Sequence, residues 1–322
     1  TAVITVANSL NQNYETTTSF SILINAQDNG NGNLSSQGVA TITLIDQNEP
    51  PSIGNQQFSV NENSGNGTFV GNVLATDPDL GQNISFSIIS GNTDNAFGIN
   101  ASTGTISVSN SGALNFELTP SYSLLVGVQD NGSGNLNSQA IVLISMNDIN
   151  EAPIVNNQAF SVAENSPNGT YLGTIIASDP DVGQILSYSI QSGNTLGAFS
   201  IDALTGQLFV VNSSALDYEL TSNFELEVQV QDNSIAGLAD QALISVSLID
   251  VNEYPIVSNQ TFSVSEFSAN GSSVGIVSAM DPDEGQTLLY AIVAGNVNNA
   301  FLINSSTGEI TVNESLALNY QV

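Results

Sequence analysis

The sequence contains no lysine, no arginine and no histidine. Proteins that bind the phosphate backbone of nucleic acids need cationic side chains, so this class of function is excluded. Without histidine, the most frequent general base and the imidazole metal ligand are also missing. The 30 aspartate and glutamate residues have no basic partner in their own chain. Any close cluster of them therefore needs protons or external cations to balance its charge.

Cysteine is also absent, which excludes disulfide bonds and thiol chemistry. The longest apolar runs, such as residues 140–144, fall far short of the roughly 20 residues that a membrane-spanning helix needs, so we predict no spanning segment. Apolar residues still make up 41% of the 322 residues. This is enough to fill the cores of two or three domains, and the composition predicts a folded, strongly acidic protein.

An internal repeat organises the whole sequence. Asp46, Asp148 and Asp250 are 102 residues apart, and the same spacing relates the motif Asp-Pro-Asp at 77, 179 and 281. The spacing predicts half a unit at 1–50, complete units at 51–152 and 153–254, and two thirds of a unit at 255–322, which we call the first to fourth repeats. Both ends of the sequence fall inside a unit, which indicates a window from a longer array.

Within one repeat, hydrophobicity alternates with a period of two. In the third repeat the runs of strand length are 160–165, 170–179, 186–193, 199–202, 207–211, 223–232 and 241–250. Turn signals such as Asn168-Gly169 and Thr205-Gly206 separate them, and no helical stretch of ten residues occurs. The pattern predicts an all-β, seven-stranded antiparallel sandwich rather than a closed barrel. Seven strands place the ends of a unit at opposite poles, which favours a linear array.

The acidic residues recur where predicted strands end and where one repeat joins the next. The junction between the second and third repeats is expected to collect Glu62, Glu117, Asp148, Glu151, Asp179, Asp181 and Asp232. The next junction is expected to collect Glu164, Asp217, Glu219, Asp250, Glu253, Asp281 and Asp283. Such recurrent positions hold 22 of the 30 acidic residues, which argues against a merely solvated acidic face. Hard oxygen ligands without soft donors favour Ca²⁺, and three ions would offset most of the charge of one junction.

These motifs together resemble the cadherin repeat. They are "DPD" after an apolar strand, "LDYE", "xEN" near the first strand, "QDN" after the sixth strand and "DxNExP" at the link, and the resemblance covers the whole chain. It implies Greek-key sandwiches of the cadherin and immunoglobulin type in a linear array, with up to three Ca²⁺ between successive repeats.

The resemblance also assigns the ligands. Glu62, Glu117, Asp148, Glu151 and Asp181 would share two inner ions, and Asp179, Asp181, Asn150 and Asp232 would hold an outer one. The complete predicted set is Glu15, Asp28, Asp46, Asn48, Glu49, Glu62, Asp77, Asp79, Glu117, Asp130, Asp148, Asn150, Glu151, Glu164, Asp179, Asp181, Asp217, Glu219, Asp232, Asp250, Asn252, Glu253, Glu266, Asp281 and Asp283.

Two departures from the family pattern affect these sites. The second aspartate of the linker motif is glutamate at 49, 151 and 253, and the asparagine after it is replaced by Pro50, Ala152 and Tyr254. The aspartate of "LDxE" is kept only as Asp217 and is asparagine at 13, 115 and 319. We therefore expect the junction after the second repeat to bind one Ca²⁺ more loosely than the junction after the third. Gln321 stands in the glutamate position of the fourth repeat.

The leading functional prediction is a calcium-stiffened rod or stalk segment of a large extracellular, cell-surface adhesin, without enzymatic activity. Its partners would be neighbouring repeats of the same chain and molecules of the cell surface or matrix, not nucleic acid. The absence of tryptophan excludes, in this segment, the tryptophan exchange of animal cell-adhesion cadherins. Near-identical repeats, the lack of cysteine and the abundance of asparagine, serine and threonine favour a bacterial surface protein.

Three alternatives remain. A calcium-dependent module could recognise glycan or protein through its sandwich loops, although the aromatic candidates Phe69, Tyr171 and Tyr188 lie at strand positions that predict core. An enzyme could use paired carboxylates such as Asp179 and Asp181 for glycoside hydrolysis, but a catalytic pair is not expected to recur three times. A filament could form if incomplete units of neighbouring chains completed one another. Residues 1–16 and 307–322 would then duplicate one segment, which disfavours it.

Overall fold

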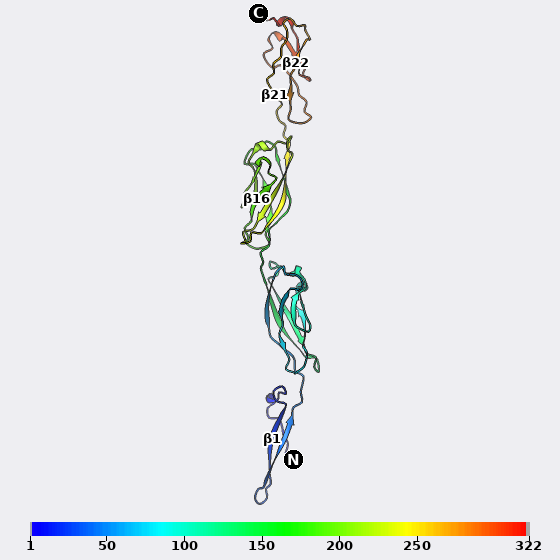
Figure 1. Ribbon diagram of the computed structural model, residues 1–322, viewed down its shortest axis with the longest axis vertical. Coiled ribbons are helices and arrows are strands. Elements are labelled where there is room, and N and C mark those ends of the chain that lie inside the picture. The colour runs from blue at the N-terminus through cyan, green and yellow to red at the C-terminus, as the bar shows by residue number, and fades with distance from the viewer. Residues whose placement is uncertain (1, 320–322) are drawn as a thin grey trace. The chain divides into compact units, whose positions relative to one another are not determined.

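The structure is a computed structural model that describes residues 2–319. It divides into two compact units, Thr1–Asn150 and Glu151–Val322, which are described separately. Figure 1 labels β1 in the first unit and β16, β21 and β22 in the second. Strands dominate both units. The helices among the described residues are three-residue 3-10 turns, namely η1 (Ser9–Asn11), η2 (Thr93–Asn95), η3 (Ser111–Ala113), η4 (Thr195–Gly197), η5 (Ser213–Ala215), η6 (Val297–Asn299) and η7 (Ser315–Ala317). The expectation of an all-β fold is confirmed.

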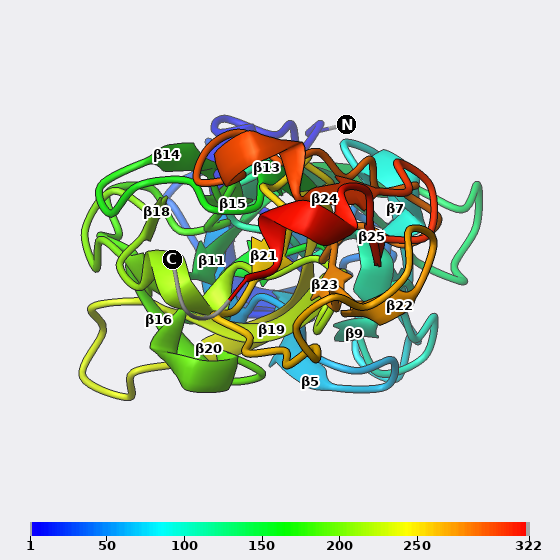
Figure 2. The ribbon, with the colours of Figure 1, turned by 90° about the horizontal axis from the view of Figure 1, so that it is seen from above.

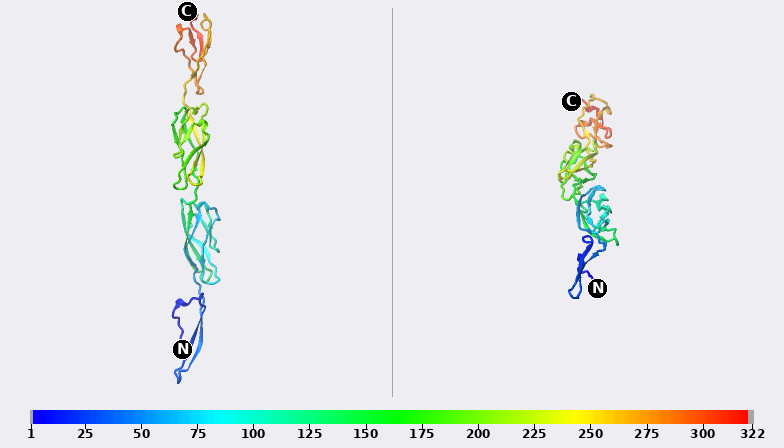
Figure 3. Two further views of the ribbon diagram at one scale, coloured as in Figure 1. Left: turned by 60° about the vertical axis from the view of Figure 1, so that its left-hand side comes forward. Right: turned by 60° about the horizontal axis from the view of Figure 1, so that its bottom comes forward.

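The first unit contains a hairpin and one complete sandwich. The hairpin pairs β1 (Ser19–Gln27) with β2 (Ser35–Thr43) and is drawn in blue in Figure 3. The sandwich comprises β3 (Ser52–Ile53), β4 (Gln56–Asn61), β5 (Phe69–Asn72), β6 (Ala75–Thr76), β7 (Ser85–Ser90), β8 (Phe97–Ile99), β9 (Thr105–Val108), β10 (Ser121–Gln129) and β11 (Asn137–Asn147). One sheet has the order β4-β11-β10-β7, the second has the order β5-β9-β8, and β3 pairs with β6.

The second unit repeats this topology. Its strands are β12 (Ile154–Val155), β13 (Gln158–Ala163), β14 (Tyr171–Thr174), β15 (Ala177–Ser178), β16 (Ser187–Ser192), β17 (Phe199–Ile201), β18 (Gln207–Val210), β19 (Asn223–Gln231) and β20 (Ala239–Ile249), followed by β21 (Ile256–Val257), β22 (Ser273–Ile276), β23 (Ala279–Met280), β24 (Phe301–Ile303) and β25 (Glu309–Val312). The sheets have the orders β13-β20-β19-β16, β14-β18-β17, β22-β25-β24, β12-β15 and β21-β23. In Figure 2, β16, β19 and β20 lie together, apart from β14 and β18 of the other sheet.

One feature of the sandwich differs from the antiparallel prediction. The first predicted strand, 160–165, corresponds to β13, which pairs with β20; an unpredicted short strand before it, β12, pairs with β15. The pairing of β13 with β20 is parallel, and β4 and β11 are parallel in the same way. Alternating hydrophobicity reports which face of a strand is buried but not the direction of its neighbour, and for that reason the sequence pattern missed this parallel pair.

The core of each complete sandwich lies between its two sheets. In β19, Phe224, Leu226, Val228 and Val230 point inward and are buried. The intervening residues of that strand are polar and face the outside of the sheet. The same alternation in β10 and β11 supplies the core of the second repeat. Apolar burial, which involves no carboxylate, therefore stabilises each complete repeat.

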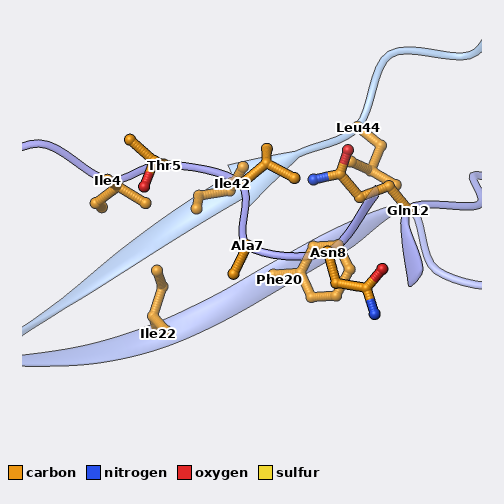
Figure 4. A pocket seen from close by; sticks show the side chains of 10 residues that line it. Ile4, Thr5, Ala7, Asn8, Gln12, Phe20, Ile22, Ile42 and Leu44 are labelled. Atoms are coloured by element: carbon orange, nitrogen blue, oxygen red, sulfur yellow. The ribbon is translucent and has the colours of Figure 1, made fainter. Parts of the chain in front are cut away.

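Among the described residues, the hairpin of the first repeat has no second sheet to cover its apolar face. Phe20 is 37% exposed, whereas Tyr122, its counterpart in the second repeat, is 3% exposed. Phe20, Ile22, Ile42 and Leu44 line an open hollow of about 490 Å³ (Figure 4). In the fourth repeat, residues 260–265 and 289–294 form no strand. Their counterparts in the third repeat pair with β19 and β20, which have no equivalent among residues 255–319.

The aromatic residues expected in the core divide into two groups. Tyr188 packs against the core, as predicted. Phe69 and Tyr171 do not, since they are 61% and 53% exposed. A shift of the strand register between Tyr171 and Gly173 turns the ring of Tyr171 outward, where it contacts Phe209 at a centroid distance of 5.6 Å. The expectation that strand aromatics are core is wrong at these two positions.

Gly193 tests the packing of the third repeat. Its φ is +81°, and a Cβ atom at this position would lie 1.8 Å from the carbonyl oxygen of Glu225. We expect Gly193→Ala to lower the free energy of unfolding of this repeat by at least about 3 kcal/mol, because backbone strain and steric overlap add. Denaturant titration monitored by circular dichroism measures this free energy. Gly197→Asn is the control, because Asn95 and Asn299 hold the matching place with positive φ. A similar loss in both variants would contradict the prediction.

Candidate metal centres

Four carboxylates meet where the first repeat is linked to the second, within the first unit. Glu15 precedes β1, Asp46 and Glu49 lie in the link, and Asp79 follows β6. One ligand oxygen from each lies within 4.8 Å of the others. No cationic side chain exists to separate them, so four negative charges at such distances repel one another unless a cation is bound.

Main-chain and amide hydrogen bonds hold this arrangement on the second repeat. Asp77 Oδ1 accepts the N–H of Asp79 at 2.9 Å, and Asp79 Oδ2 accepts the N–H of Glu49 at 2.9 Å. Asn48 Nδ2 donates to Asp130 Oδ2 at 3.0 Å. The other oxygen of Asp130 accepts the N–H of Gly132 and of Leu136. The link is thus attached to the repeat that follows it.

A second set of carboxylates lies between the third and fourth repeats, within the second unit. Glu164, Glu219 and Glu253 form one group, and Glu219, Asp250 and Asp283 form another, each with ligand oxygens within 4.8 Å. Glu219 belongs to both groups. The two groups together take ligands from the preceding repeat, from the link and from the following repeat. Two adjacent ions that share one carboxylate fit this arrangement.

Glu164 fixes the link to the repeat that precedes it. Its Oε2 accepts the N–H of Tyr218 at 2.7 Å and its Oε1 accepts the N–H of Val251 at 2.8 Å. Two residues later, the N–H of Glu253 donates to Asp283 Oδ2 at 2.9 Å. Neighbouring residues of one link are therefore attached to different repeats, and the carboxylates come together because of these two attachments.

The predicted junction between the second and third repeats is divided between the two units. On the first unit, Glu62 accepts the N–H of Ile149 and of Phe116, each at 2.8 Å. Glu117 has a ligand oxygen within 4.8 Å of one from Glu62 and of one from Asp148. On the second unit, the N–H of Glu151 donates to Asp181 Oδ2 at 2.8 Å, and Asp179 Oδ1 accepts the N–H of Asp181. The bonds of Glu62 match those of Glu164, and the bonds of Asp181 match those of Asp79 and Asp283.

The buried carboxylates of the described residues all belong to the predicted set. They are Glu62, Asp79, Asp130, Glu164, Asp181, Asp232 and Asp283, with exposed fractions between 2% and 8%. Four buried carboxylate oxygens, Glu49 Oε2, Asp77 Oδ2, Asp179 Oδ2 and Glu253 Oε2, have no hydrogen-bond partner. Buried acceptors without partners are rare and indicate an absent ligand or ion. Several clustered oxygens of this kind fit Ca²⁺, which takes six to eight oxygen ligands.

Burial and mutual repulsion raise the pKa of several of these groups. Burial raises the pKa of Glu49, and the charges of Glu15 and Asp79 raise it further. Burial also raises the pKa of Asp250, with the charges of Asp283 and Glu164 adding to the effect. For Glu253, burial raises the pKa and the hydrogen bond from Asn165 opposes it. In the absence of metal, the clusters therefore hold protons more tightly than free carboxylates do.

This electrostatic arrangement predicts a dependence of stability on pH. A carboxyl group whose pKa is higher in the folded state than in the unfolded state favours folding at low pH, and this contribution is lost as pH rises from about 4 through the raised pKa. In buffer freed of divalent cations, we therefore expect the thermal midpoint to rise as the pH is lowered from 7.5 towards 4.5. Scanning calorimetry measures this. With Ca²⁺ present the rise should vanish, and a fall without Ca²⁺ would contradict the prediction.

Some predicted ligands are not in these clusters. Asp28 is exposed, and its Oδ1 accepts the N–H of Gly30 and of Leu34, as Asp130 does in the second repeat. Asp217 Oδ1 accepts the N–H of Leu220 at 2.8 Å, and Asn115 makes the same bond to Leu118. Glu266 is exposed. Gln321 lies outside the described residues.

Sequence reasoning missed two kinds of side chain at the junctions. Asn165 Nδ2 donates to Glu253 Oε1 at 2.7 Å. Gln82 and Gln286 contact the linker asparagines Asn48 and Asn252. The signal was available, because glutamine recurs at 82, 184 and 286 with the spacing of the repeat. It was overlooked because a neutral amide adds nothing to a count of charges.

The comparison with protein families agrees with this geometry. The cadherin domain matches residues 56–147, 158–249 and 260–321. The chain belongs to the cadherin family. Its cadherin repeats stand in tandem, and each complete repeat is a β-sandwich.

Curated relatives extend far beyond this chain. Human protocadherin Fat 4 is 33% identical over 303 residues, which cover 89% of this cadherin chain and 6% of the relative. Rat cadherin-23 is 31% identical over 318 residues, covering 92% and 10%. The Drosophila melanogaster protocadherin-like wing polarity protein stan is 30% identical over 319 residues, covering 94% and 9%. The chain thus spans about a tenth or less of these relatives.

Solved structures show the same repeats. Mouse cadherin-23 EC22–24 has a TM-score of 0.64 at 25% identity, covering 84% of this chain and 90% of that one. Protocadherin gammaB7 EC3–6 has a TM-score of 0.63 at 26% identity, covering 94% and 78%. The relatives named here are animal proteins, so the expectation of a bacterial surface protein is not supported. Among the described residues of this cadherin, no helix is long and apolar enough to cross a membrane.

Proposed function

We propose that this chain is a calcium-stiffened segment of the stalk of a large extracellular adhesion protein. Cadherin repeats are modules of such proteins. The observation that carries the proposal is the set of buried carboxylate oxygens without partners, at the links, in a chain that has no basic side chain. The proposed setting is extracellular, where Ca²⁺ is abundant enough for modules that bind it at about 10⁻⁴ to 10⁻³ M.

The bound ions would be held by groups that belong to different repeats. Between the third and fourth repeats, Glu164 and Glu219 come from the preceding repeat, Asp250 and Glu253 from the link, and Asp283 from the following repeat. Between the first and second repeats, Glu15, Asp46, Glu49 and Asp79 play the corresponding parts. The ions supply positive charge. The chain supplies ligands fixed by main-chain hydrogen bonds, so that binding restrains one repeat against the next.

This arrangement favours a structural role over catalysis. A polar link of five or six residues would otherwise act as a flexible joint. The carboxylate groups recur at each link with the same attachments, which is expected of repeated structural joints and not of a single catalytic pair. The partners we propose are neighbouring repeats of the same long chain, with cell-surface or matrix molecules bound elsewhere along it.

Asp217→Asn tests the metal sites with little disturbance of the fold. Asn115 makes the same turn contact in the second repeat, so the variant should keep its stability. We expect one Ca²⁺ at the junction after the third repeat to bind up to about tenfold more weakly, through the loss of one nearby charge. Equilibrium dialysis against buffered Ca²⁺ counts the bound ions. Asp94→Asn is the control, since Asn298 holds the matching place. If the unmodified chain bound no Ca²⁺ at millimolar concentration, the proposed function would be rejected.

A further inference from the structure

A neutral amide pair recurs beside the carboxylates at two links. Gln82 Nε2 donates to Asn48 Oδ1 at 2.6 Å, and Gln286 Nε2 donates to Asn252 Oδ1 at 3.0 Å. Each glutamine follows the Asp-Pro-Asp motif by three residues. Its own N–H is directed to the carbonyl of the second aspartate, Asp79 or Asp283, at 3.4 Å. The same loop that carries a candidate ligand therefore carries the amide donor.

The amide of Asn48 is held at both ends. Its oxygen accepts from Gln82, and its Nδ2 donates to Asp130 Oδ2. The space that it fills depends on Gly132, because a Cβ atom there would lie 1.6 Å from Asn48 Oδ1. Gln82 Oε1 is buried close by and has no hydrogen-bond partner. Asn48 is thus fixed in one orientation by contacts that involve neither metal nor a basic side chain.

We propose that Gln82 and Gln286 are positioning residues for the outer Ca²⁺ of their junctions, an inference that rests on the function proposed above. They hold the side-chain oxygen of the linker asparagine in place before the ion arrives. Fixing a free side chain opposes binding, so orientation in advance strengthens it. Partners of metal ligands that do not touch the metal change metal affinity 10- to 100-fold when removed.

Some contacts of the link form without metal, and others need it. The link is docked onto the following repeat by the amide pair and by the bond from the Glu49 N–H to Asp79, both of which exist without metal. An amide has no charge to titrate, so this docking persists where the carboxylates are repelled. Metal binding then has to complete only the contacts to the preceding repeat.

The experiment uses the full chain and replaces glutamine with methionine, which keeps the length of the side chain but cannot donate a hydrogen bond. Gln82, Gln184 and Gln286 are changed together, because Gln184 occupies the matching position in the third repeat. The Ca²⁺ affinity of all the outer sites is then tested in one variant. We expect about tenfold weaker binding of the outer ions and unchanged binding of the inner ones, counted by native mass spectrometry over a range of free Ca²⁺. Gln139→Met, on the exposed face of β11, is the control.

A double-mutant cycle separates positioning from a general effect on stability. Gln82→Met, Asn48→Ala and the double variant are compared, with thermal midpoints measured in parallel. If Gln82 acts through Asn48, the change of Gln82 has no further effect once Asn48 is alanine. Additive losses, or an unchanged outer site in Gln82→Met, would overturn the inference and leave the calcium function standing. A wild-type chain that binds no Ca²⁺ would overturn both.

Discussion

Chelation of Ca²⁺ from the full chain is expected to increase its flexibility strongly and to leave its strands intact. The cores of the complete repeats consist of apolar side chains, so circular dichroism should not change. The links lose the charges that balance their carboxylates. Unit charges about 4 Å apart at an effective dielectric constant of 20 repel by roughly 4 kcal/mol, which outweighs the few hydrogen bonds of a link. Small-angle scattering should show a stiff particle with Ca²⁺ and a broad distribution of shapes with excess chelator.

Single substitutions localise this effect. Asp181→Ala should loosen the joint after the second repeat and no other, because Asp181 belongs to one link. Asp94→Ala, remote from the links, should leave the scattering profile unchanged. An identical profile with and without Ca²⁺ would show that the acidic residues are solvated and do not stiffen the links. The sandwich loops would then be the first region to test for a binding surface.

Replacing Glu164 with alanine is expected to weaken both the stability of the third repeat and the binding of Ca²⁺. The side chain is 2% exposed and accepts two main-chain N–H groups, from Tyr218 and Val251. Each buried donor left without a partner costs about 1–3 kcal/mol, so the loss of both acceptors should cost the third repeat about 2–6 kcal/mol even without metal. Binding of the ion proposed at Glu164, Glu219 and Glu253 should be lost as well. Denaturant titration and ion counting on the same samples measure the two effects.

Two further variants make this test specific. Glu164→Gln keeps one acceptor oxygen but places an amide donor beside a second donor, so we expect an intermediate loss of stability. Glu225→Ala removes an exposed carboxylate from the outer face of β19 and should change neither stability nor ion count. If Glu164→Ala were as stable as Glu225→Ala, the attachment of the link to the preceding repeat would have no energetic weight.

Much of the architecture could be predicted from the residues. Alternating hydrophobicity gives the strands of the third repeat, because burial on one face of a strand imposes a period of two. The absence of basic residues made the positions of Glu62, Asp79 and Asp181 informative, since a buried carboxylate without a cationic partner demands another solution. The carboxylates that are buried are therefore those that the repeat spacing had selected.

Other features depend on geometry that no periodicity reports. The parallel pairing of β13 with β20 follows from a strand that changes sheets after two residues. Tyr171 turns outward because the register shifts beside it. Gln82 acts through a neutral hydrogen bond to a residue 34 positions away, and neither charge nor hydrophobicity marks such a contact. Asp217 is of a residue type that binds Ca²⁺, but its side chain accepts a main-chain N–H in a local turn.

The parallel pairs also determine how a repeat responds to being pulled. In the second repeat, β4 and β11 are the first and last long strands, and six residue pairs from Gln56–Val142 to Asn61–Asn147 align them in the same direction. Force that enters at the start of β4 and leaves at the end of β11 acts along both strands in opposite senses. It therefore shears all the hydrogen bonds of this pair at once instead of opening them one by one. A repeat built in this way resists tension along the chain most strongly at the pair of strands that carries the load.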